Sequence, residues 1–127
     1  FAKKNNNFFL FKSINYKDYL SILKNCEYII GNSSSAIIEA PTLNIPSINI
    51  GNRQHGRLRA NSIFDTNYSK QKIKKKIEKA LLFKKKGVKI INPYDHGNAI
   101  EKIIKVLKKE TTFQNVKNIS FNNIKLK

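Results

Sequence analysis

Apolar residues along the chain follow two spacings, short uninterrupted runs and recurrences every three to four residues. The short runs, which are bounded by Gly, Pro or polar residues, predict buried strands over residues 8–11, 27–31, 46–50 and 62–64. The longer spacing predicts helices over residues 16–25, 33–40 and 69–85. Strands that alternate with helices predict an α/β layer fold with a parallel sheet.

A further helix is expected near the end of the chain. Asn98 can cap it, and its buried side would carry Ile100, Ile103, Ile104 and Leu107. Residues 111–127 have weak periodicity and are expected to form a tail. We therefore expect one domain over residues 1–110, a length that suffices for a single core.

The chain is strongly basic. Lys and Arg number 25 against 8 Asp and Glu, which gives a net charge of +17. Such a field attracts nucleic acid, so a basic nucleic-acid-binding protein is one alternative. Only three of these cations are arginine, and Asn and Ile are also abundant. This bias makes Lys the default surface residue and so favours solvated lysine faces over a specific nucleic-acid site. A nucleic-acid-binding protein would also interleave aromatic residues with its basic surface, whereas most Phe and Tyr here fall in core-like runs or the tail.

Cysteine content and hydropathy narrow the class further. Cys26 is the single cysteine, so no disulfide framework or thiolate metal site is expected. No apolar run reaches the roughly 18 residues that cross a bilayer. We expect a cytoplasmic protein with no membrane partner. Because the chain lacks Met and begins at Phe1, we also expect it to be a piece of a longer protein.

Candidate chemistry gathers where the second predicted strand ends. Gly31 and Asn32 are followed by Ser33, Ser34 and Ser35 at the start of a predicted helix. Amide N–H groups and hydroxyls at a helix N-terminus favour an anion, and the carboxyl end of a parallel strand is a common ligand site. Ordinary helix capping explains one serine, but three in a row favour a phosphate site.

A carboxylate and a cluster of arginines extend this candidate site. Glu39 lies one helical turn after Ser35 and could accept hydrogen bonds from a ribose diol, although it could also be a surface glutamate. Arg53, Arg57 and Arg59 are the only arginines, and all lie in the loop after the next strand. Their fork-shaped donors suit a diphosphate, with exposed loop arginines as the alternative. Together these residues predict a nucleotide site.

Two segments also carry a family resemblance. GNSSSAIIEAP (31–41) and IPSINIGNRQHGR (45–57) resemble the signature of hydrolysing UDP-N-acetylglucosamine 2-epimerases, which feed sialic-acid and related nonulosonate synthesis. The flanking NYKDYLSILKNCEYIIGN and NPYDHGNAIEKIIKVL are similar as well, so the resemblance spans about residues 8 to 108. It implies a Rossmann-like parallel sheet with helices on both faces, as an incomplete C-terminal domain of a GT-B fold.

The resemblance also implies roles for individual residues. Ser33 and Ser34, in one run with Ser35, match positions that contact the diphosphate of UDP, and Glu39 matches the position that binds the ribose hydroxyls. Three further residues match other parts of the nucleotide site: Arg53 a basic position, Tyr19 an aromatic position near the uracil, and Ile14 a position lining the base pocket.

The sequence departs from the family pattern in small ways and lacks its catalytic groups. Ala36 stands where Gly is common, and Asp95, His96 and Gly97 replace a Gly-Asp-Gly turn. The family's catalytic carboxylates and histidine lie upstream of this region, and His55 does not match that histidine, nor does His96. We therefore assign no catalytic residue to this chain.

The implied activity is conversion of UDP-N-acetylglucosamine and water to N-acetylmannosamine and UDP, with no cofactor or metal. The expected partners are the UDP-sugar and an N-terminal domain of the same enzyme, and a homo-oligomer is compatible with this picture. UDP-N,N′-diacetylbacillosamine is an alternative substrate. A UDP-sugar-binding domain of a GT-B glycosyltransferase is an alternative function.

Overall fold

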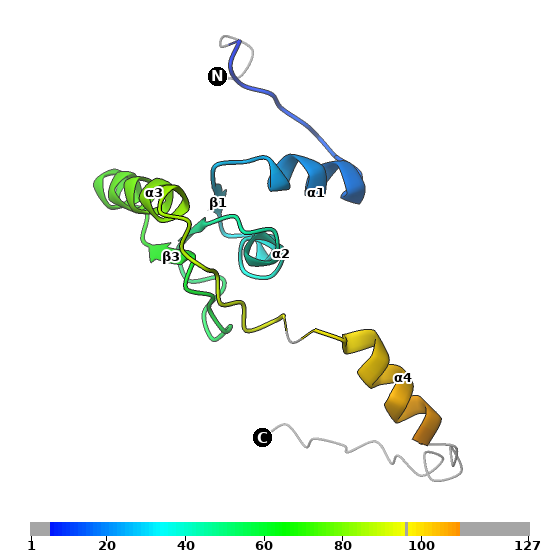
Figure 1. The fold of residues 1–127 in the computed structure, drawn as a ribbon. Helices are drawn as coiled ribbons and strands as arrows, with labels where there is room; N and C mark the ends of the chain where they lie inside the picture. The colour runs from blue at the N-terminus through cyan, green and yellow to red at the C-terminus, as the bar shows by residue number, and fades with distance from the viewer. Residues whose placement is uncertain (1–5, 96, 110–127) are drawn as a thin grey trace, which may run out of the picture. The chain divides into compact units, whose positions relative to one another are not determined.

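The computed structural model describes residues 6–95 and 97–109. The chain divides into two units, Phe1–Asp95 and His96–Lys127. In the larger unit the elements are α1 (Tyr16–Lys24), β1 (Ile29–Gly31), a 3-10 turn η2 (Ser34–Ala36), α2 (Glu39–Thr42), β2 (Ser47–Ile50), β3 (Ile63–Thr66) and α3 (Lys70–Lys85) (Figure 1). The second unit contains α4 (Ala99–Lys109). His96 and the predicted tail 111–127 lie outside the described residues.

The described strands form one parallel sheet in the order β1-β2-β3. Gly31 pairs with Asn49, and Asn49 pairs with Asp65. Because both pairings are parallel, the carboxyl ends of all three strands meet at the same edge of the sheet. The strands predicted over 27–31, 46–50 and 62–64 are thus confirmed, as are the helices predicted over 16–25 and 69–85.

Helices cover both faces of this sheet, with α3 on one side of the strands and α1 and α2 on the other (Figure 1). Side chains alternate between the two faces along each strand. Ile29 packs against the cluster of Leu23, Ala40 and Ile45. On the opposite face Ile48 packs with other apolar side chains of β3 and α3. This is the Rossmann-like α/β arrangement that the sequence predicts.

The strand predicted at 8–11 is not formed. These residues are irregular, and their four apolar side chains are exposed: Phe8, Phe9, Leu10 and Phe11. A strand needs a hydrogen-bonding neighbour, and within the described part of the chain the sheet contains only β1, β2 and β3. The apolar run alone was therefore an insufficient signal for a strand.

The helix predicted after Asn98 is present as α4, but its apolar face is not buried. The residues expected on the buried side are exposed by 43 to 74% among those described: Ile100, Ile103, Ile104 and Leu107. Helical periodicity reports that one face is apolar but does not say what covers it. The prediction of the element was correct and the prediction of its burial was wrong.

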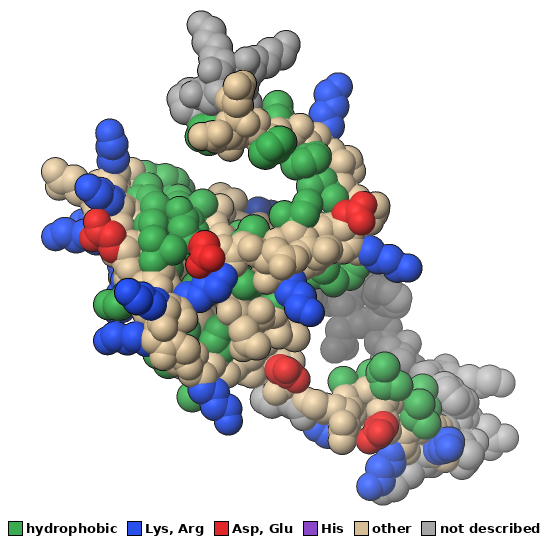
Figure 2. All heavy atoms as spheres, turned by 45° about the horizontal axis from the view of Figure 1, so that its top comes forward, with side chains coloured by type: hydrophobic (Ala, Val, Ile, Leu, Met, Phe, Trp, Pro, Cys, Tyr) green, Lys and Arg blue, Asp and Glu red, His purple; other side chains and the backbone are tan. Residues whose placement is uncertain are grey.

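The distribution of lysines can be followed on one face of the molecule. On the face shown in Figure 2, Lys and Arg side chains are dispersed among polar and apolar surface rather than gathered into one continuous patch. This distribution fits solvated lysine faces. Across residues 6–95 and 97–109, no helix is long and apolar enough to cross a membrane.

The two-faced core predicts a large cost for truncating Ile48, which is 0% exposed. Ile48→Ala should lower the free energy of unfolding by about 2–5 kcal/mol, measured by urea denaturation, because it opens a cavity beside Phe64 and Ala80. The control Leu82→Ala truncates a side chain on α3 that is 52% exposed. It should change the free energy of unfolding by about 0.5 kcal/mol or less. Equal losses in the two variants would contradict this description of the core.

Candidate nucleotide-binding site

The serine run lies directly after β1, at the carboxyl edge of the sheet. Ser33 caps η2, and its Oγ accepts a hydrogen bond from the Ser35 amide at 3.3 Å. Ser33 and Ser34 are exposed. Their amide N–H groups find no acceptor among the described residues. These two residues therefore present hydroxyl and amide donors at the surface, as a site for an anionic oxygen requires.

Ser35 differs from its two neighbours. It is buried, with 8% exposure, and its hydroxyl is hydrogen-bonded to the hydroxyl of Tyr19. Tyr19 comes from α1 and packs against the cluster that contains Ala40. The structure thus brings two predicted site residues together, but their bond joins α1 to the turn formed by residues 32–36, which we call the serine turn. Ser33 and Ser34 are better placed than Ser35 to reach a ligand.

The helix predicted over 33–40 is broken into the 3-10 turn η2 and the four-residue α2. Pro41 explains the break, because proline cannot donate the hydrogen bond that an uninterrupted helix needs at this point. By restarting at Glu39, the chain places Pro41 in the first turn of α2, where no donor is required. The serine turn therefore does not stand at the start of a long helix with a large dipole. An anion there would instead be held by individual hydroxyl and amide donors.

Glu39 is half-buried at the start of α2. Its Oε2 atom is enclosed by protein and accepts no hydrogen bond from the described residues. The break in the helix also means that Glu39 and Ser35 do not share one regular helical face, contrary to the sequence-based expectation. Enclosing a carboxylate oxygen without a donor is unfavourable, which makes Glu39 a strong acceptor for a group that could donate to it.

The basic loop follows β2 and begins at Gly51, whose φ of 80° is in the left-handed region that glycine tolerates. Arg53 reaches the serine turn, with its NH1 3.4 Å from the Asn32 carbonyl oxygen. Gln54 donates from Nε2 to the same oxygen at 2.7 Å. The loops after β1 and β2 are thereby held side by side, which places the guanidinium of Arg53 close to the turn that carries Ser33.

The three arginines are not equivalent. Arg57 is exposed, and only its backbone takes part in the hydrogen bonds found among the described residues. Arg59 donates to the Asp65 carboxylate and to two backbone carbonyl oxygens of the loop. Of the three, Arg53 is the one that contacts the serine turn.

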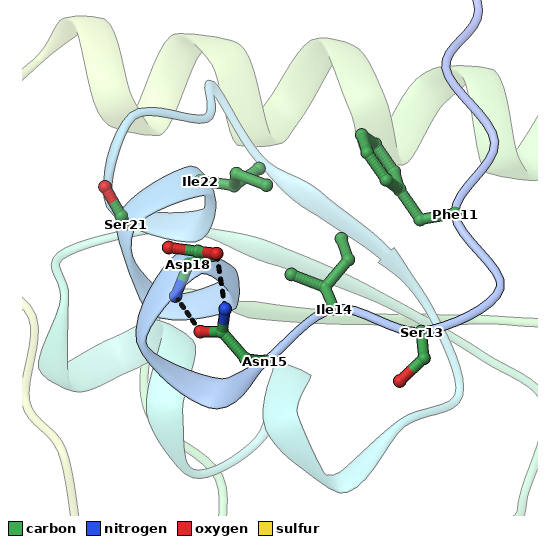
Figure 3. A pocket seen from close by; sticks show the side chains of 7 residues that line it. All are labelled: Phe11, Ser13, Ile14, Asn15, Asp18, Ser21 and Ile22. Atoms are coloured by element: carbon green, nitrogen blue, oxygen red, sulfur yellow. Dashed lines mark hydrogen bonds between the residues drawn. The ribbon is translucent and has the colours of Figure 1, made fainter.

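Ile14 lines a hollow of about 480 Å³ beside α1 (Figure 3). Its apolar walls come from Phe11, Ile14 and Ile22, whose side chains surround the hollow in Figure 3. Asn15 and Asp18 form its polar side, and Asn15 caps α1 by accepting from the Asp18 amide at 3.0 Å. The lining includes none of Ser33, Ser34, Glu39 and Arg53. The role of Ile14 beside a base stays a prediction.

Four polar residues that support the site were not singled out from the sequence: Ser47, Asn49, Gln54 and Asp65. Ser47 is fully buried and donates to the Ala36 carbonyl oxygen at 2.7 Å, which fixes the end of η2 to β2. A sequence signal did exist, because Ser47 and Asn49 are polar residues inside a strand that is otherwise apolar. Buried polar residues of this kind need partners, and here the partners are the Ala36 carbonyl oxygen at the end of η2 and the Asp65 carboxylate on β3.

The larger unit is thus a Rossmann-like α/β unit whose polar groups collect at the carboxyl edge of its sheet, where such folds bind ligands. Comparison with known proteins gives the family. The family model described as UDP-N-acetylglucosamine 2-epimerase matches residues 1–108. The chain therefore belongs to the UDP-N-acetylglucosamine 2-epimerase family.

Individual relatives agree with this assignment. The chain is 37% identical over 100 residues to the polysialic acid biosynthesis protein P7 of Escherichia coli, across 76% of this chain and 25% of that protein. It is 40% identical over 73 residues to the UDP-N-acetylglucosamine 2-epimerase of Neisseria meningitidis serogroup B, across 58% and 19% of the two chains. It is 49% identical over 57 residues to the hydrolysing GDP/UDP-N,N′-diacetylbacillosamine 2-epimerase of Campylobacter jejuni, across 45% and 15%. The chain spans about a quarter or less of the length of these curated relatives.

The bond between Tyr19 and Ser35 predicts a measurable coupling. Tyr19→Phe and Ser35→Ala should each lower the free energy of unfolding by about 0.5–1.5 kcal/mol, since each removes one partner of a part-buried hydrogen bond. Because both variants break the same bond, the double variant should lose less than the sum of the two. Tyr16→Phe, at a tyrosine that is 63% exposed, is the control. Strictly additive losses would show that the two hydroxyls do not interact.

Proposed function

We propose that this chain is the nucleotide-holding part of a hydrolysing UDP-N-acetylglucosamine 2-epimerase. Membership of the family and the relatives' names support this activity. The observation that carries the role of this part is the junction at the Asn32 carbonyl oxygen, where Arg53 meets the serine turn. Hydroxyl, amide and guanidinium donors lie together there, as a diphosphate requires.

In this proposal the diphosphate lies against Ser33, Ser34 and Arg53, and the ribose diol donates to Glu39. A diol supplies two O–H donors, and Glu39 has a carboxylate oxygen that lacks one among the described residues. Because Oε2 is enclosed, the Glu39 side chain turns toward the ligand when it binds. Tyr19 then acts by holding α1 to the serine turn, in addition to its proposed place near the uracil.

The proposed reaction begins with loss of UDP from the sugar. A base removes the C2 proton, the C1–O bond breaks toward UDP, and a 2-acetamidoglucal is left. Water then adds across the double bond, which gives N-acetylmannosamine. The groups in this chain stabilise the negative charge that grows on UDP as it leaves, and the base belongs to the remainder of the enzyme. We propose that the isolated chain holds UDP but does not turn over the sugar nucleotide.

The names of the relatives differ in the sugar. The Neisseria meningitidis relative is named for UDP-N-acetylglucosamine, whereas the Campylobacter jejuni relative is named for N,N′-diacetylbacillosamine nucleotides. Both names nevertheless describe a sugar that is attached to a nucleoside diphosphate. We propose UDP-N-acetylglucosamine as the substrate, with the diacetylated sugar as the second candidate. The family match supports an epimerase rather than a GT-B glycosyltransferase module.

The proposed contact between Glu39 and the ribose predicts a nucleotide preference. The chain should bind UDP more tightly than 2′,3′-dideoxy-UDP by about tenfold, measured by calorimetry, because the dideoxy nucleotide leaves the carboxylate without donors. Glu39→Ala should remove this preference. Glu101→Ala, at an exposed glutamate of α4, should preserve it. Equal affinity of the unmodified chain for both nucleotides, or no binding of either, would exclude the assigned role of Glu39.

A further inference from the structure

Arg59 is bonded to the protein through all three of its side-chain nitrogens. Its Nε donates to Oδ2 of Asp65 at 3.1 Å, its NH1 to the Arg57 carbonyl oxygen at 2.7 Å and its NH2 to the Gln54 carbonyl oxygen at 2.8 Å. The side chain is 26% exposed. A guanidinium whose nitrogens all donate to protein oxygens is suited to holding a loop in one conformation rather than to reaching a ligand.

Asp65 fixes the other end of this contact to the sheet. Its Oδ1 accepts from Nδ2 of Asn49 at 2.6 Å, so both carboxylate oxygens have a partner. Asn49 is 1% exposed on the central strand β2 and is the register partner of Asp65 on β3. The Asp65 side chain is itself 52% exposed, but one of its carboxylate oxygens is bonded to a buried amide of the central strand and the other to Arg59.

The same bonds continue toward the serine turn. Arg59 binds the carbonyl oxygen of Gln54, and the side chain of Gln54, which is 3% exposed, donates to the Asn32 carbonyl oxygen. Arg53 is the neighbour of Gln54 in sequence, and its NH1 lies 3.4 Å from that same oxygen. An unbroken series of hydrogen bonds thus joins the middle of the sheet to the residue that precedes Ser33.

We propose that Arg59 and Asp65 are positioning residues, which hold the loop 51–60 so that Arg53 faces the serine turn. The inference rests on the proposed UDP site and adds residues to it that would not touch the nucleotide. Donors act on a developing charge only when they are held close to the required geometry, so a residue that fixes the loop sets the strength of the contact that Arg53 makes. We call this pair of side chains the Arg59–Asp65 brace.

The brace and a simple charge effect predict opposite results for Asp65→Asn. If only charge mattered, removing a carboxylate near the site would strengthen binding of an anionic nucleotide. If the brace positions Arg53, the same change loosens Arg59 and weakens binding. We expect Asp65→Asn and Arg59→Lys each to weaken UDP binding about tenfold. The double variant should bind UDP little worse than either single variant, because both changes disrupt the same contact between Arg59 and Asp65.

The experiment combines two measurements on the 127-residue chain. Calorimetry gives the affinity for UDP, and amide hydrogen exchange without ligand gives the opening of the loop. Both variants should speed exchange over residues 52–58 while the strands stay protected, which also verifies that each variant is folded. The control is Glu27→Gln, which alters the Lys84–Glu27 pair, 3.5 Å apart, and should change neither measurement.

The outcomes separate the brace from the proposed function. Unchanged exchange in the loop overturns the brace, and so does tighter or unaltered UDP binding by Asp65→Asn. If the unmodified chain binds no UDP, the proposed function fails, and the exchange measurement alone decides whether Arg59 and Asp65 hold the loop. Faster loop exchange together with weaker UDP binding in both variants supports the proposal.

Discussion

Parallel pairing of β2 with both of its neighbours is the constraint on which the arrangement of polar groups depends. It brings the carboxyl ends of β1, β2 and β3 to one edge, so the loops after β1 and β2 leave the sheet next to each other. Asn32 and Arg53 are 21 residues apart in sequence, yet this geometry places them in contact. The close-packed faces on either side leave this edge as the place where polar groups can gather without being buried in the core.

The buried polar residues of β2 find their partners in the segments on either side of this strand. Ser47 donates to the Ala36 carbonyl oxygen at the end of η2, and Asn49 donates to the Asp65 carboxylate on β3, which also accepts from Arg59. Each would be costly in an apolar core without these bonds. The polar groups inside β2 therefore support the two loops, and the loops in turn present Ser33, Ser34 and Arg53.

Periodicity predicted the regular elements well, because β1, β2, β3, α1 and α3 each bury an apolar face against a neighbour. It failed where a pattern depends on a partner or on local backbone chemistry. The run 8–11 has strand-like composition but no described strand beside it, and the apolar face of α4 is exposed. The predicted helix 33–40 is divided between Ala36 and Glu39, ahead of Pro41, whose effect on the backbone is not part of a periodicity argument.

Residue chemistry predicted the site in outline but could not rank its members. Three serines and three arginines are equivalent in a sequence, whereas in the fold Ser35 bonds to Tyr19 and Arg59 bonds to Asp65. That distinction comes from contacts between residues far apart in the chain, which no local pattern contains. The resemblance to the epimerases located the segment, and the hydrogen bonds separate residues that can face a ligand from residues that hold the fold.

We propose that a uridine nucleotide lies at the junction of the serine turn and the basic loop that follows β2. The most direct test is a titration of the isotope-labelled chain with UDP, followed through the backbone amide resonances. The account predicts that the largest shifts fall on residues 32–34 and 53–54, with small shifts along α3. Largest shifts among the lysines of α3, or no shifts at saturating UDP, would contradict it.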